Sequence, residues 1–271
     1  MTRRIQITSR SNERLKGVRR LARRRAPDRF VIEGYRQLRS ALDANARVRE
    51  VYAAPALFLG NDDGALVARA ERLGAVAHEL SRSAFLSLSG RVRADGLLAV
   101  VERPSTELAD VGAFVAVAQG IERPGNLGAL VRTACAAGVE TLIVADGRTD
   151  LFHPDAVRGS VGTIFRVQLV QASTAEALAG LTEHRILVAT PDAAVPYWAA
   201  GYEGPTAIVL GGERHGVGAA WFEAADATVS IPMAPAADSL NVAVAAGVVL
   251  LEAARQRGAG QAPVDGGARV A

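Results

Sequence analysis

Three segments in the second half of the chain combine glycines with polar side chains in patterns that could bind and orient a ligand. In the first, Gly125, Asn126 and Gly128 form a turn after an apolar run, and Arg132 follows Asn126 by six residues. A loop that opens into a helix exposes backbone N–H groups, which suit anionic or polar ligands. Asn126 and Arg132 are therefore candidate catalytic residues, and a solvated helix arginine is the alternative interpretation of Arg132.

The second segment, AIVLGGERHGVG, ends a predicted buried strand with four glycines within eight residues. Glycines permit a close approach between the backbone and a cofactor. The segment is neither a G-x-G-x-x-G fingerprint nor a P-loop. We place Glu213 in this candidate site, and a plain turn between two elements is the alternative. His215 has no second ligand at metal spacing, so no metal is predicted.

The third segment runs from a strand ending at Ile231 through a proline-containing loop into a helix rich in Ala and Val. We expect Ser239 to cap this helix and Asn241 to lie in its first turn. A structural cap is the simpler interpretation of Ser239 on its own.

Positive charge is concentrated at the N-terminus. Residues 1–29 hold eleven Lys or Arg against Glu13 and Asp28, which is +9 within a net charge of +3. Lysine and arginine gain affinity for polyanions by displacing counterions from phosphates. A basic helix capped by Thr8, Ser9 or Ser11 is predicted here, with nucleic-acid contacts from Arg10, Arg14, Lys16, Arg19 and Arg20. The alternative is a solvated face in a chain that favours arginine, since Lys16 is its only lysine.

The remaining composition excludes several classes of protein. A single cysteine, Cys135, cannot form an intrachain disulfide, which is typical of a reducing compartment, and we expect a cytoplasmic protein. The longest apolar stretches, such as residues 242–251, are far shorter than the roughly 20 residues that span a bilayer, so no membrane role is predicted.

Short apolar runs alternate with helix-like stretches in both halves of the chain, which predicts an α/β protein. Residues 102–112 lose this periodicity, and we place the boundary between a small domain (1–104) and a larger one (111–258) there. Strands at 114–118, 141–145, 165–170, 186–189, 206–210 and 228–231 should form a mostly parallel sheet. The Gly- and Ala-rich residues 259–271 are predicted to be a disordered tail.

Taken together and in this order, the three segments resemble the signature motifs of the SpoU (TrmH) family of RNA ribose methyltransferases, in the SPOUT superfamily. The resemblance covers roughly residues 111–257. The sequences ITSRSNERLKGVRRL and FVIEGYRQL in the first half are similar to the small substrate-binding domain, with a fold like that of ribosomal protein L30e, that precedes many of these enzymes.

The resemblance implies a deep trefoil knot in the larger domain, S-adenosylmethionine as the cofactor, and a homodimer with its active site near the subunit interface. It assigns the reaction to Asn126, Arg132, Glu213, Ser239 and Asn241. It assigns cofactor binding to Leu210, Gly211, Gly212, Ile231, Met233 and Leu240, with Met233 and Leu240 on either side of the adenine. Arg158 matches a basic position that reaches RNA or the partner's site, and an exposed helix arginine is the alternative there.

The sequence departs from the family pattern at three positions. Gly212 stands where an asparagine is usual, and Pro235 and Ala243 stand where glycine and serine are usual. Main-chain contacts to a cofactor could survive all three changes. Because Gly212 lacks a side chain that could order the loop, we expect any weakness in cofactor affinity there.

The predicted function is therefore S-adenosylmethionine-dependent methylation of a ribose 2'-hydroxyl in RNA, with large-subunit (23S) ribosomal RNA as the expected substrate. Three alternatives stay open at this point: a transfer RNA 2'-O-methyltransferase, a non-catalytic RNA-binding protein with the same fold, and a Rossmann-type oxidoreductase. The sequence lacks the G-x-G-x-x-G fingerprint that a Rossmann-type oxidoreductase would carry after the first strand of either domain.

Overall fold

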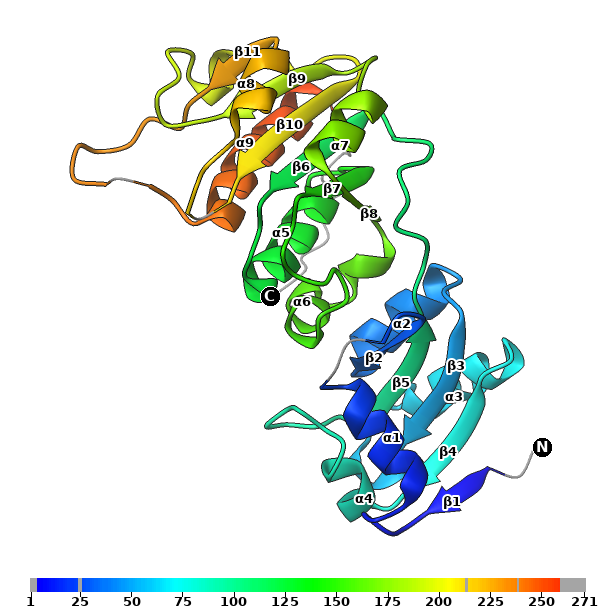
Figure 1. Ribbon diagram of the computed structural model, residues 1–271. Coiled ribbons are helices and arrows are strands. Elements are labelled where there is room, and N and C mark those ends of the chain that lie inside the picture. Colours follow the sequence, from blue (N-terminus) through cyan, green and yellow to red (C-terminus); the bar gives the residue numbers. More distant parts are fainter. Residues whose placement is uncertain (1–3, 24–25, 213, 238, 259–271) are drawn as a thin grey trace, which may run out of the picture. The chain divides into compact units, whose positions relative to one another are not determined.

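A computed structural model describes residues 4–23, 26–212, 214–237 and 239–258. The chain divides into two compact units (Figure 1). The first unit contains Met1–Thr106, Arg123–Arg132 and Arg148–Leu169, and the second contains Glu107–Glu122, Thr133–Gly147 and Val170–Ala271. The predicted boundary at residues 102–112 stays a prediction. Glu213 and the predicted tail at 259–271 lie outside the described residues.

A mixed five-stranded sheet forms the centre of the first unit, in the order β1-β4-β3-β5-β2. Its strand β5 is antiparallel to both of its neighbours, whereas β4 runs parallel to β1 and β3. The strands are β1 (Ile5–Ile7), β2 (Arg29–Glu33), β3 (Val48–Ala53), β4 (Val76–Leu80) and β5 (Leu97–Glu102).

Apolar side chains on helices and strands form the core of this unit, including Leu15 and Val18 of the basic first helix. That helix begins after Asn12, whose side chain accepts a hydrogen bond from the N–H of Arg14, so the predicted caps at Thr8, Ser9 and Ser11 are wrong. The helices are α1 (Glu13–Leu21), α2 (Tyr35–Asp43), α3 (Asp63–Arg72), α4 (Arg82–Leu86) and α6 (Pro154–Ser160), with short 3-10 turns η1 (Pro55–Leu57) and η2 (Thr163–Phe165).

The second unit is built on a six-stranded sheet in the order β11-β9-β10-β6-β7-β8. The strand pairs β11·β9, β9·β10, β10·β6 and β6·β7 are all parallel, which confirms the predicted mostly parallel sheet. Continuous apolar runs suit strands that are covered on both faces. The strands are β6 (Phe114–Gln119), β7 (Thr141–Ala145), β8 (Gln168–Ala172), β9 (Arg185–Ala189), β10 (Thr206–Gly211) and β11 (Ala227–Val229).

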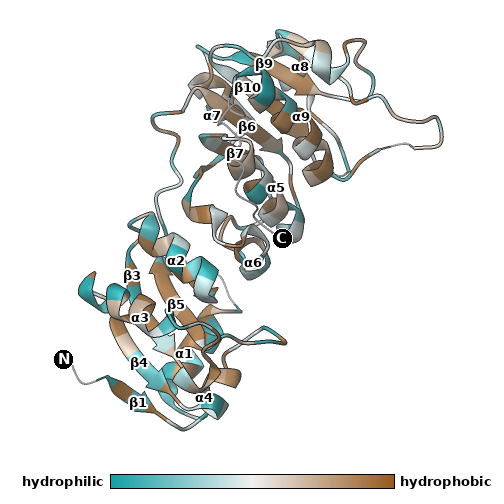
Figure 2. Ribbon diagram, turned by 180° about the vertical axis from the view of Figure 1, so that it is seen from behind, coloured by the Kyte–Doolittle hydropathy of each residue, from teal (hydrophilic) through white to brown (hydrophobic). Residues whose placement is uncertain are grey.

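Helices cover this sheet, and its central strands are the most hydrophobic part of the unit (Figure 2). Val115, Val117 and Val209 share a buried cluster with Ala177 and Trp221, which come from the helices α7 and α8. Side chains alternate along a strand, so the other face is left for α9, which packs against β10. The elements are α7 (Thr174–Gly180), η3 (Tyr197–Ala199), α8 (Ala219–Ala224), α9 (Val242–Gln256) and α5 (Pro124–Ala136), which begins in the first unit and ends in the second.

The structure corrects some predicted element boundaries. Phe165 ends the turn η2, and the strand predicted at 165–170 begins only at Gln168. The short elements β1, α6 and α8 have too few residues to show a clear period, and the sequence did not predict them. None of the helices in the described ranges is long and apolar enough to cross a bilayer.

Candidate functional site

A cavity of about 410 Å³ opens in the second unit at the carboxyl ends of β9, β10 and β11. Its volume lies in the range of small-molecule sites. From β6 the sheet continues through β7 and β8 on one side and through β10, β9 and β11 on the other, so the strand order reverses direction at β6. Ligands of open α/β sheets bind at the carboxyl ends of the strands near such a reversal. All six residues predicted to bind a cofactor line this cavity, together with two of the predicted catalytic residues: Leu210, Gly211, Gly212, Ile231, Met233, Leu240, Ser239 and Asn241.

The glycine-rich loop after β10 folds back on itself in a way that side chains would prevent. Gly216 donates its N–H to the carbonyl of Gly212 at 3.2 Å and has a φ of +63°. A Cβ added to Gly211 would lie 2.3 Å from the carbonyl carbon of Gly216, and one added to Gly212 would lie 2.6 Å from the carbonyl oxygen of Gly120. Gly212 therefore lies against backbone, and a side chain at this position requires the two segments to separate.

Gln119, the last residue of β6, holds the far end of this loop. Its side-chain oxygen accepts a hydrogen bond from the N–H of Gly218 at 2.7 Å, and its amide nitrogen donates to the Thr174 hydroxyl at 3.4 Å. Thr174 in turn donates to Asp146 at 2.5 Å and accepts from the indole N–H of Trp221 at 3.2 Å. Gln119 is not among the predicted site residues, although its position directly after the predicted strand 114–118 was a signal.

The segment that follows β11 leads into α9, and the residue that caps this helix differs from the predicted one. Asn241 is the N-cap of α9, and its side chain accepts a hydrogen bond from the N–H of Ala243 at 2.9 Å. The prediction of Ser239 as the cap is therefore wrong by two residues. Ser239 is exposed, and it lines the cavity beside Leu240. Thr190, which directly follows β9, also lines the cavity and was not predicted.

Asn126 and Arg132 lie on α5 and are assigned to the first unit. Asn126 lies inside the first turn of the helix, which begins at Pro124. Arg132 is exposed, and no described residue forms an ion pair with it. Gly128 lets α5 approach α6, because a Cβ at this position would lie 2.5 Å from the carbonyl oxygen of Ala156. Neither Asn126 nor Arg132 lines the cavity described above, and their part in catalysis stays a prediction.

Comparison with models of known protein families identifies the family to which the three predicted site segments belong. The model of the SpoU rRNA Methylase family matches residues 113–251, just over half of the chain. The chain belongs to the SpoU rRNA methylase family. A second model, the MRM3-like substrate binding domain, matches residues 12–99. The predicted family is thereby confirmed.

Named SpoU relatives resemble both halves of the chain. The 23S rRNA (guanosine(2553)-2'-O)-methyltransferase RlmP of Bacillus subtilis is 28% identical over 90% of this chain and 97% of its own length. The 23S rRNA (uridine(2479)-2'-O)-methyltransferase of Streptomyces viridochromogenes is 36% identical over 61% of this chain, and that match spans only 62% of the relative. The crystal structure of AviRb from Streptomyces viridochromogenes in complex with AdoMet superimposes with a TM-score of 0.80 at 27% identity, covering 92% of this chain and 100% of that one.

The predicted RNA-binding residues of this SpoU protein lie on or near α1, and several of them are already paired. Arg14 forms an ion pair with Glu50 at 2.9 Å, and Lys16 forms one with Glu13 at 2.6 Å. Arg19 donates to the backbone carbonyl of Arg10 at 2.8 Å, and Arg20 is exposed. On α6, Arg158 is exposed and pairs with Asp155 at 3.1 Å. The free positive charge on this face is smaller than the count of basic residues suggests.

Glu50 ties the basic helix to the sheet beneath it. Its carboxylate lies 3.3 Å from the Nε2 of the buried His78 and accepts hydrogen bonds from the Tyr52 hydroxyl at 2.5 Å and from Arg14 at 2.9 Å. These bonds, with the one from His78 contributing most, lower the pKa of Glu50 to about 2 against an opposing effect of burial. Burial and the neighbouring carboxylate raise the pKa of Tyr52. This cluster positions α1 and is a structural element of the domain.

Proposed function

We propose that this chain transfers a methyl group from S-adenosylmethionine to a ribose 2'-hydroxyl of RNA, with 23S ribosomal RNA as the substrate. The observation that carries the proposal is the cavity in the second unit, because the second and third family segments meet there. Family membership and the names of the relatives support the reaction and the substrate.

The lining of the cavity fits S-adenosylmethionine. Met233 is half-buried and Leu240 is 39% exposed, and both offer apolar surface for an adenine ring. The backbone of Leu210 and Gly211 offers polar main-chain groups at the carboxyl end of β10. When bound, the cofactor supplies a methyl group on a positively charged sulfonium. The AdoMet complex of AviRb is a structure of a relative with the same fold.

In this proposal Arg132 and Asn126 act on the RNA. A guanidinium stays protonated and is a poor base, so Arg132 holds a phosphate of the RNA and donates a hydrogen bond to the ribose oxygen. The hydroxyl proton passes to water as the oxygen takes up the methyl group. Asn126 orients the hydroxyl or Arg132. Placing the hydroxyl in line with the methyl group can lower the reaction barrier by roughly 7 to 11 kcal/mol. These side chains can therefore contribute to catalysis by orientation alone. Glu213, Ser239 and Asn241 shape the pocket.

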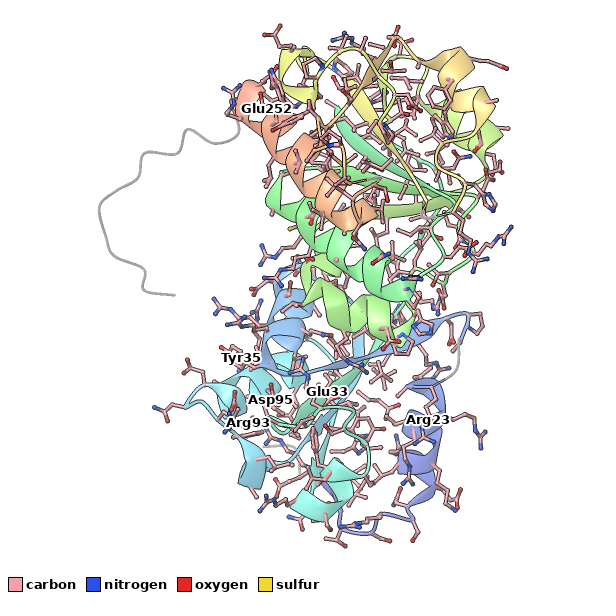
Figure 3. All side chains as sticks on the ribbon, turned by 90° about the vertical axis from the view of Figure 1, so that its left-hand side faces the viewer. Arg23, Glu33, Tyr35, Arg93, Asp95 and Glu252 are labelled. Atoms are coloured by element: carbon pink, nitrogen blue, oxygen red, sulfur yellow. The ribbon has the colours of Figure 1, made fainter. Side chains whose placement is uncertain are left out.

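The protein is proposed to work as a homodimer with a trefoil knot in its second unit and to reside in the cytoplasm. The face of α9 that points away from β10 supports the dimer: Val244 and Leu251 are 53% and 51% exposed, and with Tyr197 and Val248 they line an open apolar groove. Figure 3 marks Glu252, a polar residue of the same groove. Because Val242 and Ala245 of the same helix line the cofactor cavity, a second copy seated here would lie beside the active site.

Calorimetric titration of the full chain with S-adenosylmethionine, with NAD as the control, tests the cofactor assignment. We expect saturable binding of one cofactor per chain and no heat from NAD. Retained binding by Arg132→Ala would agree with a role for Arg132 on the RNA. Absence of binding with RNA present would contradict the enzyme and favour a non-catalytic RNA-binding protein. Methylation of transfer RNA in place of ribosomal RNA would favour the other alternative.

A further inference from the structure

The first unit contains a second cavity, of about 280 Å³, that shares no lining residue with the cofactor cavity. It lies among α1, the loop 87–91 and α6. Among the described residues, six arginines line it against the single carboxylate of Glu33: Arg19, Arg23, Arg29, Arg91, Arg103 and Arg158. Such an excess of one sign of charge around a concave surface attracts an anion.

Two of these arginines have no carboxylate partner within the described ranges. Arg19 donates only to a backbone carbonyl, and the side chain of Arg23, marked in Figure 3, has no hydrogen-bond or ion-pair partner there. Glu33 does not pair with Arg19 or Arg23, and its carboxylate accepts hydrogen bonds from the Ser89 hydroxyl and from the N–H of Gly90. The other four arginines form ion pairs of 2.6 to 3.6 Å, namely Arg29 with Asp28, Arg91 with Asp95, Arg103 with Asp150 and Arg158 with Asp155.

Buried polar atoms of two lining residues lack partners. Gln37 is only 2% exposed, and its side-chain nitrogen donates to the carbonyl of Val157 at 3.4 Å, but its Oε1 accepts no hydrogen bond. The Nε of Arg103 also has none, although both of its terminal nitrogens donate to Asp150. A buried acceptor or donor without a partner destabilises the fold. This cost points to a ligand that completes the bonding.

Buried aromatic rings form the floor of the cavity beneath its cationic side chains, since Phe30 and Phe152 are each 3% exposed. The Arg103 guanidinium stands 5.0 Å from the ring centre of Phe152, which lies 4.7 Å from the ring of Phe30. Proteins recognise single-stranded RNA by stacking unpaired bases on aromatic rings or guanidinium planes and by bonding their edges, while arginines hold the phosphates. Here Arg19 and Arg23 meet the requirement for the phosphates and Gln37 Oε1 meets that for a base edge, while the packed rings shape the floor of the cavity.

We propose that this cavity receives one unpaired nucleotide of the RNA substrate, other than the nucleotide that is methylated. An N–H on the edge of the base bonds to Gln37 Oε1, and the flanking phosphates lie on Arg19 and Arg23. This inference rests on the proposed function in that it takes RNA as the substrate. It adds a recognition site for the shape of that RNA, since only an unpaired base can enter.

The first test measures the binding of a short labelled single-stranded RNA to the full chain by fluorescence anisotropy, with a blunt-ended duplex that contains the same strand as the paired competitor. The double variant Arg19→Gln/Arg23→Gln should bind about tenfold more weakly and lower the slope of log affinity against log salt by about one to two. The control Arg72→Gln/Arg82→Gln changes two exposed arginines of the same unit that do not line the cavity and should bind as the parent does. Equal losses in the two double variants would overturn the proposal.

Gln37→Met separates recognition from a structural role. It removes the unpaired acceptor while keeping an unbranched side chain, so thermal stability should be equal or higher, whereas the preference for single-stranded RNA over the duplex should fall. A lower stability with an unchanged preference would overturn the assignment of Gln37. Failure of the enzyme proposal would appear separately, as absent cofactor binding in the same preparations.

Discussion

The side-chain oxygen of Gln119 lies 2.7 Å from the backbone nitrogen of Gly218, so the last residue of β6 holds the end of the glycine-rich loop that begins after β10. The two strands are parallel neighbours, and Leu210 and Gly211 pair with Ala118 and Gln119. The sheet register therefore places this anchor directly beside the loop that it holds. A loop that is already ordered loses less conformational freedom when a ligand binds.

Gln119→Leu should weaken the binding of S-adenosylmethionine about tenfold, because the N–H of Gly218 loses its acceptor and the loop is released. Gln119→Glu keeps an acceptor for that N–H and should retain most of the affinity. Calorimetric titration of both variants measures the difference. Equal affinities for Gln119→Leu and the parent protein would show that the loop is held by its own backbone contacts.

Gly212→Ala should impair cofactor binding more than its single added carbon suggests, since the new Cβ would meet the backbone oxygen of Gly120 at 2.6 Å. Gly212→Asn, which restores the residue usual in the family, should meet the same obstruction. Gly64→Ala is the matched control, because Gly64 lies in α3 and has no atom within 4 Å of an added Cβ. Tighter binding by Gly212→Asn would contradict the close approach and support the predicted weakness at Gly212.

The sequence predicted the strands and the glycine-rich loop of this site, but it did not predict the cap of α9 or the bond between Gly218 and Gln119. Long apolar runs and glycine clusters predicted β6, β10 and the loop after β10, because parallel strands buried on both faces leave a strong signal. The cap of α9 was misplaced because Ser239 and Asn241 are both good caps, and only the backbone path chooses between them. The bond from Gly218 to Gln119 joins residues 99 apart in sequence, and no local pattern reports such a contact.

The stability of the chain should fall in acid through Glu50. Its pKa of about 2 lies below the ordinary 4.5, so its bonded carboxylate stabilises the folded state above pH 4.5 by on the order of 2 kcal/mol, and this is lost as pH falls from about 4.5 to about 2. Glu50→Gln should therefore be less stable than the parent at pH 7 and approach it near pH 2. Urea unfolding followed by circular dichroism at several pH values measures this. A stability difference that is independent of pH would contradict the role of the charge.

Leu251→Arg should convert the proposed dimer into a monomer, since it places a charge in the apolar groove on α9 without disturbing the core. Analytical ultracentrifugation at micromolar concentration measures the oligomeric state. Leu73→Arg is the control, because Leu73 is 60% exposed and lies outside that groove. A parent protein that sediments as a monomer at every concentration would contradict the dimer proposal.

The most direct test of the account is transfer of a radiolabelled methyl group from S-adenosylmethionine to 23S ribosomal RNA, followed by complete digestion and identification of the labelled nucleoside. We expect the label on a ribose 2'-oxygen with the parent protein, and none with Arg132→Ala even though that variant still binds the cofactor. Label on a base, or equal transfer by Arg132→Ala, would contradict the proposed reaction and the role of Arg132.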